Sequence, residues 1–250
     1  THIADDALHQ GFKTIVAVGG DGTLHEVLQG IVGKNLTLGV IPFGSSNDFA
    51  RSVKIPKDIK DAVGIIARGL TKDIDIGAVN DRFFINISSL GFDGEVVARL
   101  PKMRSKYLFS LVYILGVFKE LFRYKKKRVN IIRDGADFGE FNINLVAVAN
   151  GRFYGHNMKI APRAELDDGL FDVVLIADFN PLRFIANFPK VFKGTHIYNK
   201  DLILFRCKNL TIMSNERVFI ESDGELSGRV PVEYRVFSKF QRLIVPESEL

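Results

Sequence analysis

The chain has 250 residues, 46% of them hydrophobic and 25% charged, a balance typical of a globular protein with ample material for a core. Its single cysteine excludes an internal disulfide, and the N-terminal segment has neither the basic start nor the apolar centre of a signal peptide. The net charge of +5 comes without a helix-turn-helix, zinc or RNP motif, so we expect no nucleic-acid partner.

The first third of the sequence alternates helical and strand patterns. In chain order, we predict helix 1–10, strand 14–18, helix 23–32, a strand and a loop that leads into a helical segment within 36–53, helix 57–69 and strand 73–80. Strands that alternate with helices predict a parallel sheet. Ligands of such sheets bind at the carboxyl ends of the strands, where two polar loops are expected here.

The first of these loops is the sequence GGDGT, residues 19–23. Its glycines let backbone N–H groups approach an anion, and the following helix adds its N-terminal dipole, which favours phosphate. A carboxylate such as Asp21 repels phosphate unless a cation lies between them, and Mg²⁺ suits that position. Thr23 would cap the helix or bond a phosphate oxygen. The alternative is a tight strand-to-helix turn that needs small residues.

The second loop, GSSND at residues 44–48, repeats this pattern after another apolar strand. Ser45 and Ser46 supply hydroxyl groups, while Asn47 or Asp48 would cap the next helix. Helix capping explains one polar residue but not a run of small and polar residues at the same sheet edge. We therefore expect both loops to contact the phosphates of one ligand.

Beyond residue 77 the pattern changes to alternating or fully apolar strands. These lie within 82–93, 128–134, 141–150, 170–179, 201–214, 217–225 and 230–237, whereas only 102–122 and 181–193 have a helical pattern. The fold class predicted is α/β plus mainly β. A small three-layer α/β nucleotide-binding domain, 1–77, precedes an antiparallel β-sandwich-like domain, 78–239, and 240–250 returns to the first domain.

Two segments bear on membrane contact. The apolar run 107–122 is too short to span a bilayer and is interrupted by Lys119 and Glu120, so it predicts a buried amphipathic helix. The basic run RYKKKR, 123–128, is either a solvated loop or strand edge, or a site of attraction to an anionic membrane or polyphosphate.

Five motifs occur in order along the chain. They are GGDGTLHEV (19–27), PFGSSNDFAR (42–51), LGFDGEVV (90–97), the segment from AVANGRFYG to ELDDGLFDV (147–173), and ESDGE (221–225). Together they resemble the bacterial diacylglycerol-kinase-like lipid kinases, relatives of sphingosine and ceramide kinases. The resemblance covers nearly the whole chain and implies ATP- and Mg²⁺-dependent phosphorylation of a lipid hydroxyl, such as that of diacylglycerol.

The resemblance also implies roles for individual residues. The implied nucleotide-binding positions are Gly19, Gly20, Asp21, Gly22, Thr23, Leu24, Ser45 and Asn47. The implied magnesium network, partly through water, comprises Asp21, Asp48 and Asp75. A separate structural metal site is implied at Asp168 with the carbonyls of Glu165 and Leu170.

The implied catalytic residues are Asp223 and Glu225, one of them the proton acceptor. They lie two apart, so an extended chain would direct both to one face. The alternative is a hairpin turn with Asp-Gly as its central pair, and the sequence DDG at 167–169 has the same alternative.

Family members begin with a strand, an Asn-Pro-x-x-Gly-type loop and a Thr, all absent here, so we expect a truncated chain or an incomplete nucleotide site. Two other functions remain open: an NAD-kinase-like enzyme with a soluble substrate, and a non-catalytic nucleotide-binding regulator. For a lipid kinase we expect a cytoplasmic protein, peripheral at an anionic membrane surface. A free sheet edge would allow a homodimer.

Overall fold

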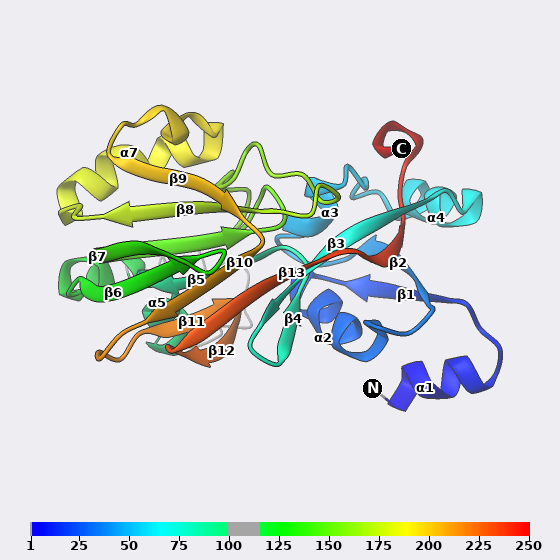
Figure 1. Cartoon of the computed structure of the whole chain (residues 1–250). Helices are drawn as coiled ribbons and strands as arrows, with labels where there is room; N and C mark the ends of the chain where they lie inside the picture. The colour runs from blue at the N-terminus through cyan, green and yellow to red at the C-terminus, as the bar shows by residue number, and fades with distance from the viewer. Residues whose placement is uncertain (1, 100–115) are drawn as a thin grey trace.

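The computed structural model describes residues 2–99 and 116–250 (Figure 1). The first elements are α1 (His2–His9), β1 (Thr14–Gly19), α2 (Asp21–Ile31), β2 (Thr37–Pro42), α3 (Asp48–Ser52), α4 (Ile59–Arg68) and β3 (Thr71–Val79). As predicted, β1 and β2 are parallel neighbours, in register from Thr14↔Thr37 to Gly19↔Pro42. Helices α2 and α4 lie on opposite faces of these strands (Figure 1).

The remaining elements are mostly strands. They are β4 (Arg82–Phe84), β5 (Ile87–Gly91), α5 (Phe92–Arg99), β6 (Lys127–Arg133), β7 (Ala136–Ala149), β8 (Phe171–Ala177), α7 (Pro181–Lys193), η1 (Thr195–Tyr198), β9 (Leu202–Cys207), β10 (Asn209–Met213), β11 (Phe219–Ser222), β12 (Glu225–Arg229), β13 (Val232–Ile244) and η2 (Glu247–Glu249). Their pairings are antiparallel except where β13 meets β2. This confirms the α/β plus mainly β fold class.

Strand β13 joins the two parts of the molecule. It pairs antiparallel with β10 at its start, antiparallel with β3 along most of its length, and parallel with β2 at Arg242 and Leu243. The pairing of β3 differs from the expectation, because β3 runs antiparallel to β13 and β4 instead of extending the parallel sheet. The sheet is therefore continuous across the expected boundary near residue 77, and that boundary stays a prediction.

Helix ends follow local capping chemistry. The Asp58 side chain accepts hydrogen bonds from the N–H groups of Lys60 and Asp61 and so starts α4, which ends at Gly69 in the left-handed conformation. Asn180 starts α7 in the same way, and Gly194 ends it. Helix α4 begins and ends within two residues of its predicted bounds, and α7 has its predicted bounds. Both agree because capping residues act on the neighbouring backbone and can be read from the local sequence.

Period-2 alternation distributes β7 and β8 between two cores. Val146, Val148, Val173 and Leu175 belong to one core cluster, together with Tyr234 and Leu210 from strands across the sheet. Their neighbours Leu145, Ala147, Val174 and Ile176 face the other side, toward α7. A third core fills the α/β part around Leu28, Leu38 and Ile76. The β-rich part thus has apolar material on both faces of its central strands.

Most of the helix predicted over 102–122 lies outside the described residues, although 116–123 is helical. Among the described residues, no helix is long and apolar enough to cross a membrane.

The role of β13 is tested by Leu243→Ala. Leu243 is fully buried where β13 pairs with β2, so its truncation should lower the free energy of unfolding by about 2–5 kcal/mol in urea titration. The matched control is Leu182→Ala, because Leu182 is 71% exposed on α7 and its truncation should change stability by less than about 0.5 kcal/mol. Equal effects of the two substitutions on the free energy of unfolding would contradict the conclusion that β13 joins the two parts of the molecule.

Candidate active site

The two loops predicted to bind phosphate meet at the ends of β1 and β2. The Phe43 N–H donates to the Gly19 carbonyl at 2.8 Å, and Gly20 and Gly44 approach backbone to backbone. A Cβ atom built on Gly44 would lie 2.3 Å from the Gly20 Cα, closer than atoms can pack. Only glycine at position 44 permits this contact, which brings both loops to one place as the sequence predicted.

Helix α2 begins at Asp21, two residues before its predicted start. Gly20 is its N-cap and supplies no side-chain bond, so Thr23 lies in the first turn rather than at the cap. The N–H groups of a first helical turn have no partner within the helix and favour an anion. Gly22, Thr23 and Ser45 are exposed here. These features fit a nucleotide phosphate at this helix N-terminus.

Two residues of the predicted nucleotide set have structural contacts instead. The Leu24 side chain lies in the core, and its N–H donates to the Gly20 carbonyl. Asn47 is buried and makes two hydrogen bonds with the backbone of Gly44, through Oδ1 at 2.9 Å and Nδ2 at 2.8 Å. Asn47 therefore shapes the second loop. Nucleotide contact by either residue stays a prediction.

Asp21 links the two loops by capping a helix that is not its own. Its carboxylate accepts hydrogen bonds from the N–H groups of Asp48 and Phe49, both at 3.1 Å, at the start of α3. Burial raises the pKa of Asp21, the two N–H donors oppose this, and the carboxylates of Asp48 and Asp223 raise it further. Asp21 thus lies close to two other acids, an arrangement that a divalent cation would stabilise.

Asp48 ties the second loop to the β-rich part. Its carboxylate accepts from the N–H groups of His156 and Asn157, both at 2.9 Å, and from the Ser46 hydroxyl at 2.5 Å. Arg51 lies 3.9 Å from the same carboxylate. His156 and Asn157 both have left-handed backbones, which aim their N–H groups at one acceptor. Asp48 does not cap α3, which is the alternative explanation of this residue, since Asp21 accepts from the first N–H groups of that helix.

Asp223 lies in the two-residue turn between β11 and β12, with Gly224. Its carboxylate accepts from the N–H groups of residues 85–87, at 3.0 to 3.1 Å, and lies 3.2 Å from His25 Nδ1. An ionised carboxylate only accepts, so the buried His25 donates from Nδ1. The four donors match the acceptor capacity of one carboxylate.

Glu225 is the first residue of β12 and is partly exposed. A Cβ atom built on Gly22 would lie 3.8 Å from its Oε1, so this carboxylate borders the GGDGT loop. The expectation that an extended chain directs Asp223 and Glu225 alike is wrong, because the hairpin turn gives them different surroundings. Asp223 is enclosed by donors from residues 85–87 and His25, and Glu225 borders the candidate phosphate site.

Asp75 is fully buried, and its carboxylate accepts from the N–H groups of Gly169 at 2.6 Å and Lys239 at 2.7 Å. It therefore holds the DDG turn against β13. Asp48 and Asp223, not Asp75, are the carboxylates that raise the pKa of Asp21. A place for Asp75 in a magnesium network stays a prediction.

The predicted structural metal site contains a guanidinium group. Asp168 accepts from the Leu170 N–H at 3.0 Å and forms an ion pair with Arg206, which also lies 3.4 Å from Asp172. Burial and the nearby Glu165 carboxylate raise the pKa of Asp172 to about 6. Within residues 2–99 and 116–250, no three His, Cys, Asp or Glu side chains are arranged to hold a metal ion. Metal binding at Glu165, Asp168 and Leu170 stays a prediction.

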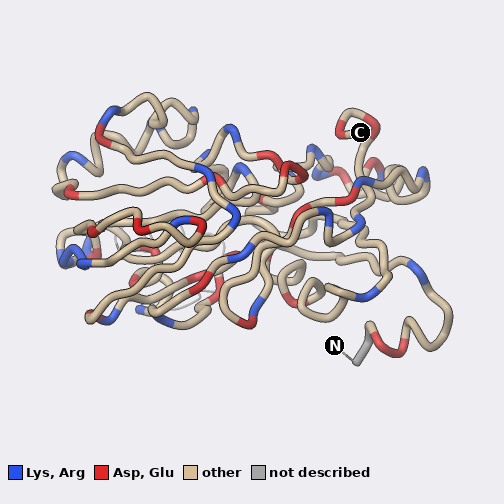
Figure 2. The backbone as a smooth tube through the Cα atoms, viewed as in Figure 1, with Lys and Arg blue, Asp and Glu red and all other residues tan. Residues whose placement is uncertain are grey.

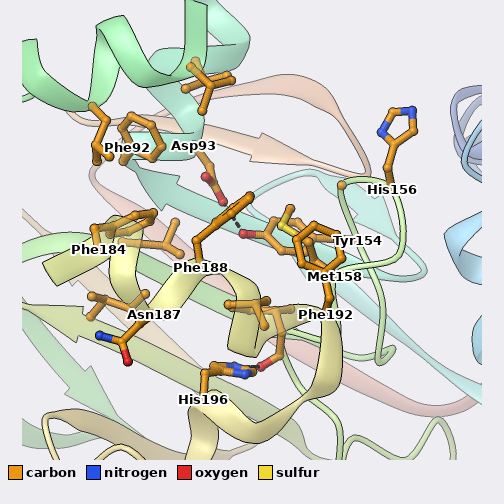
Figure 3. A pocket seen from close by; sticks show the side chains of 18 of the residues that line it. Phe92, Asp93, Tyr154, His156, Met158, Phe184, Asn187, Phe188, Phe192 and His196 are labelled. Carbon is orange, nitrogen blue, oxygen red and sulfur yellow. Dashed lines mark hydrogen bonds between the residues drawn. The ribbon is translucent and has the colours of Figure 1, made fainter. Parts of the chain in front are cut away.

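A cavity of about 870 Å³ lies next to the second loop (Figure 3). It extends from Phe43, Gly44 and Ser45 to helix α7, which presents Phe184, Phe188 and Phe192 to it. Most of its lining is apolar, and Asp93 and Tyr154 meet inside it by a hydrogen bond of 2.9 Å. Sequence reasoning did not assign Asp93, although it lies within the motif LGFDGEVV.

The basic run 123–128 is largely compensated by acidic side chains. Lys126 pairs with Asp178 at 3.2 Å, Lys127 with Glu216 at 3.3 Å, and Arg128 with Glu140. Figure 2 shows acidic positions interspersed with basic ones over the visible tube. These pairs reduce the positive field of the run, and contact with an anionic membrane through it stays a prediction.

Comparisons with known proteins show which family the chain resembles. Residues 1–79 match the model of the "Diacylglycerol kinase catalytic domain", and residues 86–245 match the "YegS C-terminal NAD kinase beta sandwich-like domain". A diacylglycerol kinase of Bacillus subtilis is 34% identical over 253 residues, covering 100% of this chain and 83% of that protein. One of Staphylococcus aureus is 32% identical, covering 92% and 74%. The crystal structure of a diacylglycerol kinase from Bacillus anthracis superposes with a TM-score of 0.77 at 26% identity, covering 95% and 79%.

The contact between the two loops predicts that Gly44→Ala is destabilising. The added Cβ meets backbone that cannot move aside, so the free energy of unfolding should fall by about 1–3 kcal/mol in urea titration. Gly64→Ala is the matched control, since a Cβ there meets only the end of Arg68 and should add about 0.5–1 kcal/mol to helix α4. A Gly44→Ala protein as stable as the control would contradict the contact.

Glu221 predicts a dependence of stability on pH. Burial raises the pKa of Glu221 to about 8, so between about pH 4.5 and 8 the folded state binds more protons than the unfolded state. The free energy of unfolding should then fall as pH rises, by up to about 1.4 kcal/mol per pH unit from this group. Glu221→Gln should flatten that slope in urea titrations at pH 5.5 and 8, while Glu233→Gln, at an exposed position, should not. Parallel slopes for all three proteins would show that Glu221 has no such role.

Proposed function

The chain belongs to the diacylglycerol kinase family, and from this premise we propose that it transfers the γ-phosphate of ATP to the hydroxyl group of a membrane lipid. The observation that carries the lipid part of the proposal is the apolar cavity beside the second loop. A soluble, NAD-like acceptor would need a polar pocket, whereas an acyl chain is stabilised by aromatic and aliphatic lining. The reaction would occur where this cavity meets the second loop, which contacts the first loop through Gly20 and Gly44.

The loops and the N-terminus of α2 support binding of the nucleotide phosphates. The first-turn N–H groups of α2 and the exposed hydroxyls of Thr23 and Ser45 are suitable donors to phosphate oxygens. Phosphoryl transfer depends mainly on positioning and charge neutralisation, which fixed backbone donors supply.

A divalent cation fits the surplus of negative charge at this place. Asp21, Asp48 and Asp223 lie near one another, with Arg51 as a basic side chain beside Asp48. Asp21 and Asp48 would hold the ion, partly through water, because their oxygens already accept backbone hydrogen bonds. When bound, Mg²⁺ would offset the charge of the phosphates.

We assign the role of proton acceptor to Glu225 and a positioning role to Asp223. In the reaction, the lipid oxygen bonds to the γ-phosphorus, the bond from that phosphorus to the β,γ-bridging oxygen breaks, and ADP leaves. The hydroxyl proton passes to Glu225, which is partly exposed beside Gly22. The lone pairs of Asp223 are already engaged by four donors, so it holds the turn on which Glu225 stands.

The assignment predicts different effects of two substitutions. Glu225→Gln should lower kcat for phosphate transfer from radiolabelled ATP to lipid in mixed micelles by about 10²–10⁴-fold, with Tm retained. Asp223→Asn should lower both kcat and Tm, because an amide cannot accept from all four donors. Glu233→Gln, exposed on β13, is the control for loss of an acidic side chain.

Two results would contradict the proposal. Full activity of Glu225→Gln would move the proton acceptor elsewhere. ATP binding without transfer to any lipid would favour a soluble acceptor or a nucleotide-binding regulator. The expected homodimer and membrane contact are separate proposals, and neither outcome depends on them.

A further inference from the structure

The apolar cavity contains one acidic side chain among the described residues that line it, Asp93, and none of those residues is Lys or Arg. Asp93 is the second residue of α5, is half-buried, and directs its carboxylate toward Tyr154 in the cavity (Figure 3). Burying a carboxylate in apolar surroundings is unfavourable unless hydrogen-bond donors surround it. In this position Asp93 therefore needs hydrogen-bond donors, which the protein or a bound ligand can supply.

Protein donors satisfy one oxygen of this carboxylate. Asp93 Oδ2 accepts from the Tyr154 hydroxyl at 2.9 Å and lies 3.1 Å from the Ser89 hydroxyl. No donor from the described part of the chain forms a hydrogen bond with Oδ1. Burial raises the pKa of Asp93, and the contacts with Tyr154 and Ser89 oppose that rise. A hydrogen-bond donor on a bound ligand would give Oδ1 a partner as well.

A chain of hydrogen bonds connects Asp93 to the turn between β11 and β12, which contains Asp223 and Gly224. The Ser89 hydroxyl also lies 2.6 Å from Glu221 Oε1, and Glu221 Oε2 accepts from the Gly224 N–H at 2.9 Å. Gly224 shares the turn with Asp223. The chain therefore connects the acid that lines the cavity to the turn that immediately precedes Glu225.

The proton count along this chain indicates which acid is the acceptor. Ser89 has a single hydroxyl proton but contacts two carboxyl groups, so one of the two acids must carry a proton for both contacts to be hydrogen bonds. Two hydroxyls, those of Tyr154 and Ser89, converge on Asp93 Oδ2 and oppose the rise that burial gives its pKa. By contrast, Glu221 Oε1 contacts Ser89 alone and burial raises the pKa of Glu221 to about 8, so we take Glu221 as the protonated partner. Glu221 then donates to Ser89, Ser89 donates to Asp93, and Asp93 is an acceptor that lines the cavity.

We propose that Asp93 determines substrate specificity by accepting a hydrogen bond from a second donor on the lipid, a hydroxyl or ammonium group besides the hydroxyl that is phosphorylated. The inference rests on the proposed lipid kinase function and narrows its substrate class. Diacylglycerol has one free hydroxyl, and its ester groups only accept hydrogen bonds. A monoacylglycerol has a second hydroxyl, and a long-chain amino alcohol has an ammonium group, so either would satisfy Asp93.

The test compares kcat/KM for three lipids of matched chain length in mixed micelles: a diacylglycerol, a monoacylglycerol and a long-chain 2-amino-1-alkanol, whose ammonium group is its only donor besides the hydroxyl that is phosphorylated. The wild-type protein should prefer one of the two donor-bearing lipids over diacylglycerol by about 10–100-fold, as expected for a hydrogen bond to a charged group. Preference for the monoacylglycerol identifies the donor as a hydroxyl, and preference for the amino alcohol identifies it as an ammonium group.

Asp93→Asn should abolish this preference, whereas the same change at the exposed Asp61 should leave it intact. Equal or better use of diacylglycerol by the wild-type protein, or an unchanged preference in a folded Asp93→Asn protein, would overturn the inference. In both cases phosphorylated lipid still appears, so the proposed kinase function stands. Label transfer to none of the three lipids would instead reject the kinase function itself. If Asp93→Asn does not fold, the preference of the wild-type protein among the three lipids still tests the inference.

Discussion

Buried and half-buried aspartates that accept hydrogen bonds from backbone N–H groups hold together the loops of this molecule. Asp21 accepts from the start of α3, Asp48 from residues 156–157, Asp75 from Gly169 and Lys239, and Asp223 from residues 85–87. Each contact joins segments distant in sequence. A loop amide without a partner and a buried carboxylate without donors are both unfavourable, and each of these pairings removes both penalties. The geometry of the candidate site depends on them.

The same arrangement creates the electrostatic character of the site. Burial raises the pKa of Asp21, and the carboxylates of Asp48 and Asp223 lie close enough to add to that rise. On the other side of the loop at residues 43–45 the surroundings become apolar. One loop therefore separates a region suited to phosphates and a cation from a region suited to an acyl chain. That juxtaposition is what the transfer of phosphate to a lipid requires.

The sequence predicted features that depend on local chemistry. Strand β1, its glycine loop and α2 follow from a few adjacent residues, and α7 has the predicted bounds because Asn180 and Gly194 cap it. Features that depend on distant partners were not accessible. The pairing of Leu243 with Leu38 and the turn that separates Asp223 from Glu225 both arise from contacts across the sheet. The role of Asp21 as a cap for α3 depends on a chain that folds back over the 27 positions that separate Asp21 from Asp48 in sequence.

The cavity also depends on contacts between segments that are distant in sequence. Its lining comes from β7, β8, α5, α7 and the loop at 154–158, so no single segment predicts its volume. Aromatic residues such as Phe184 and Phe188 were recognisable as apolar, but not as neighbours of Asp93 (Figure 3). Asp93 lay in a recognised motif and had no assigned role, since a carboxylate signals a site only when its surroundings are known.

The most direct test of the account is a crystal structure of the protein with Mg²⁺ and a non-hydrolysable ATP analogue. The account predicts the triphosphate between the N-terminus of α2 and the loop at residues 43–45, with its terminal phosphate toward Glu225 and the mouth of the apolar cavity. A triphosphate bound elsewhere, or one separated from Glu225 and the cavity by folded chain, would contradict it.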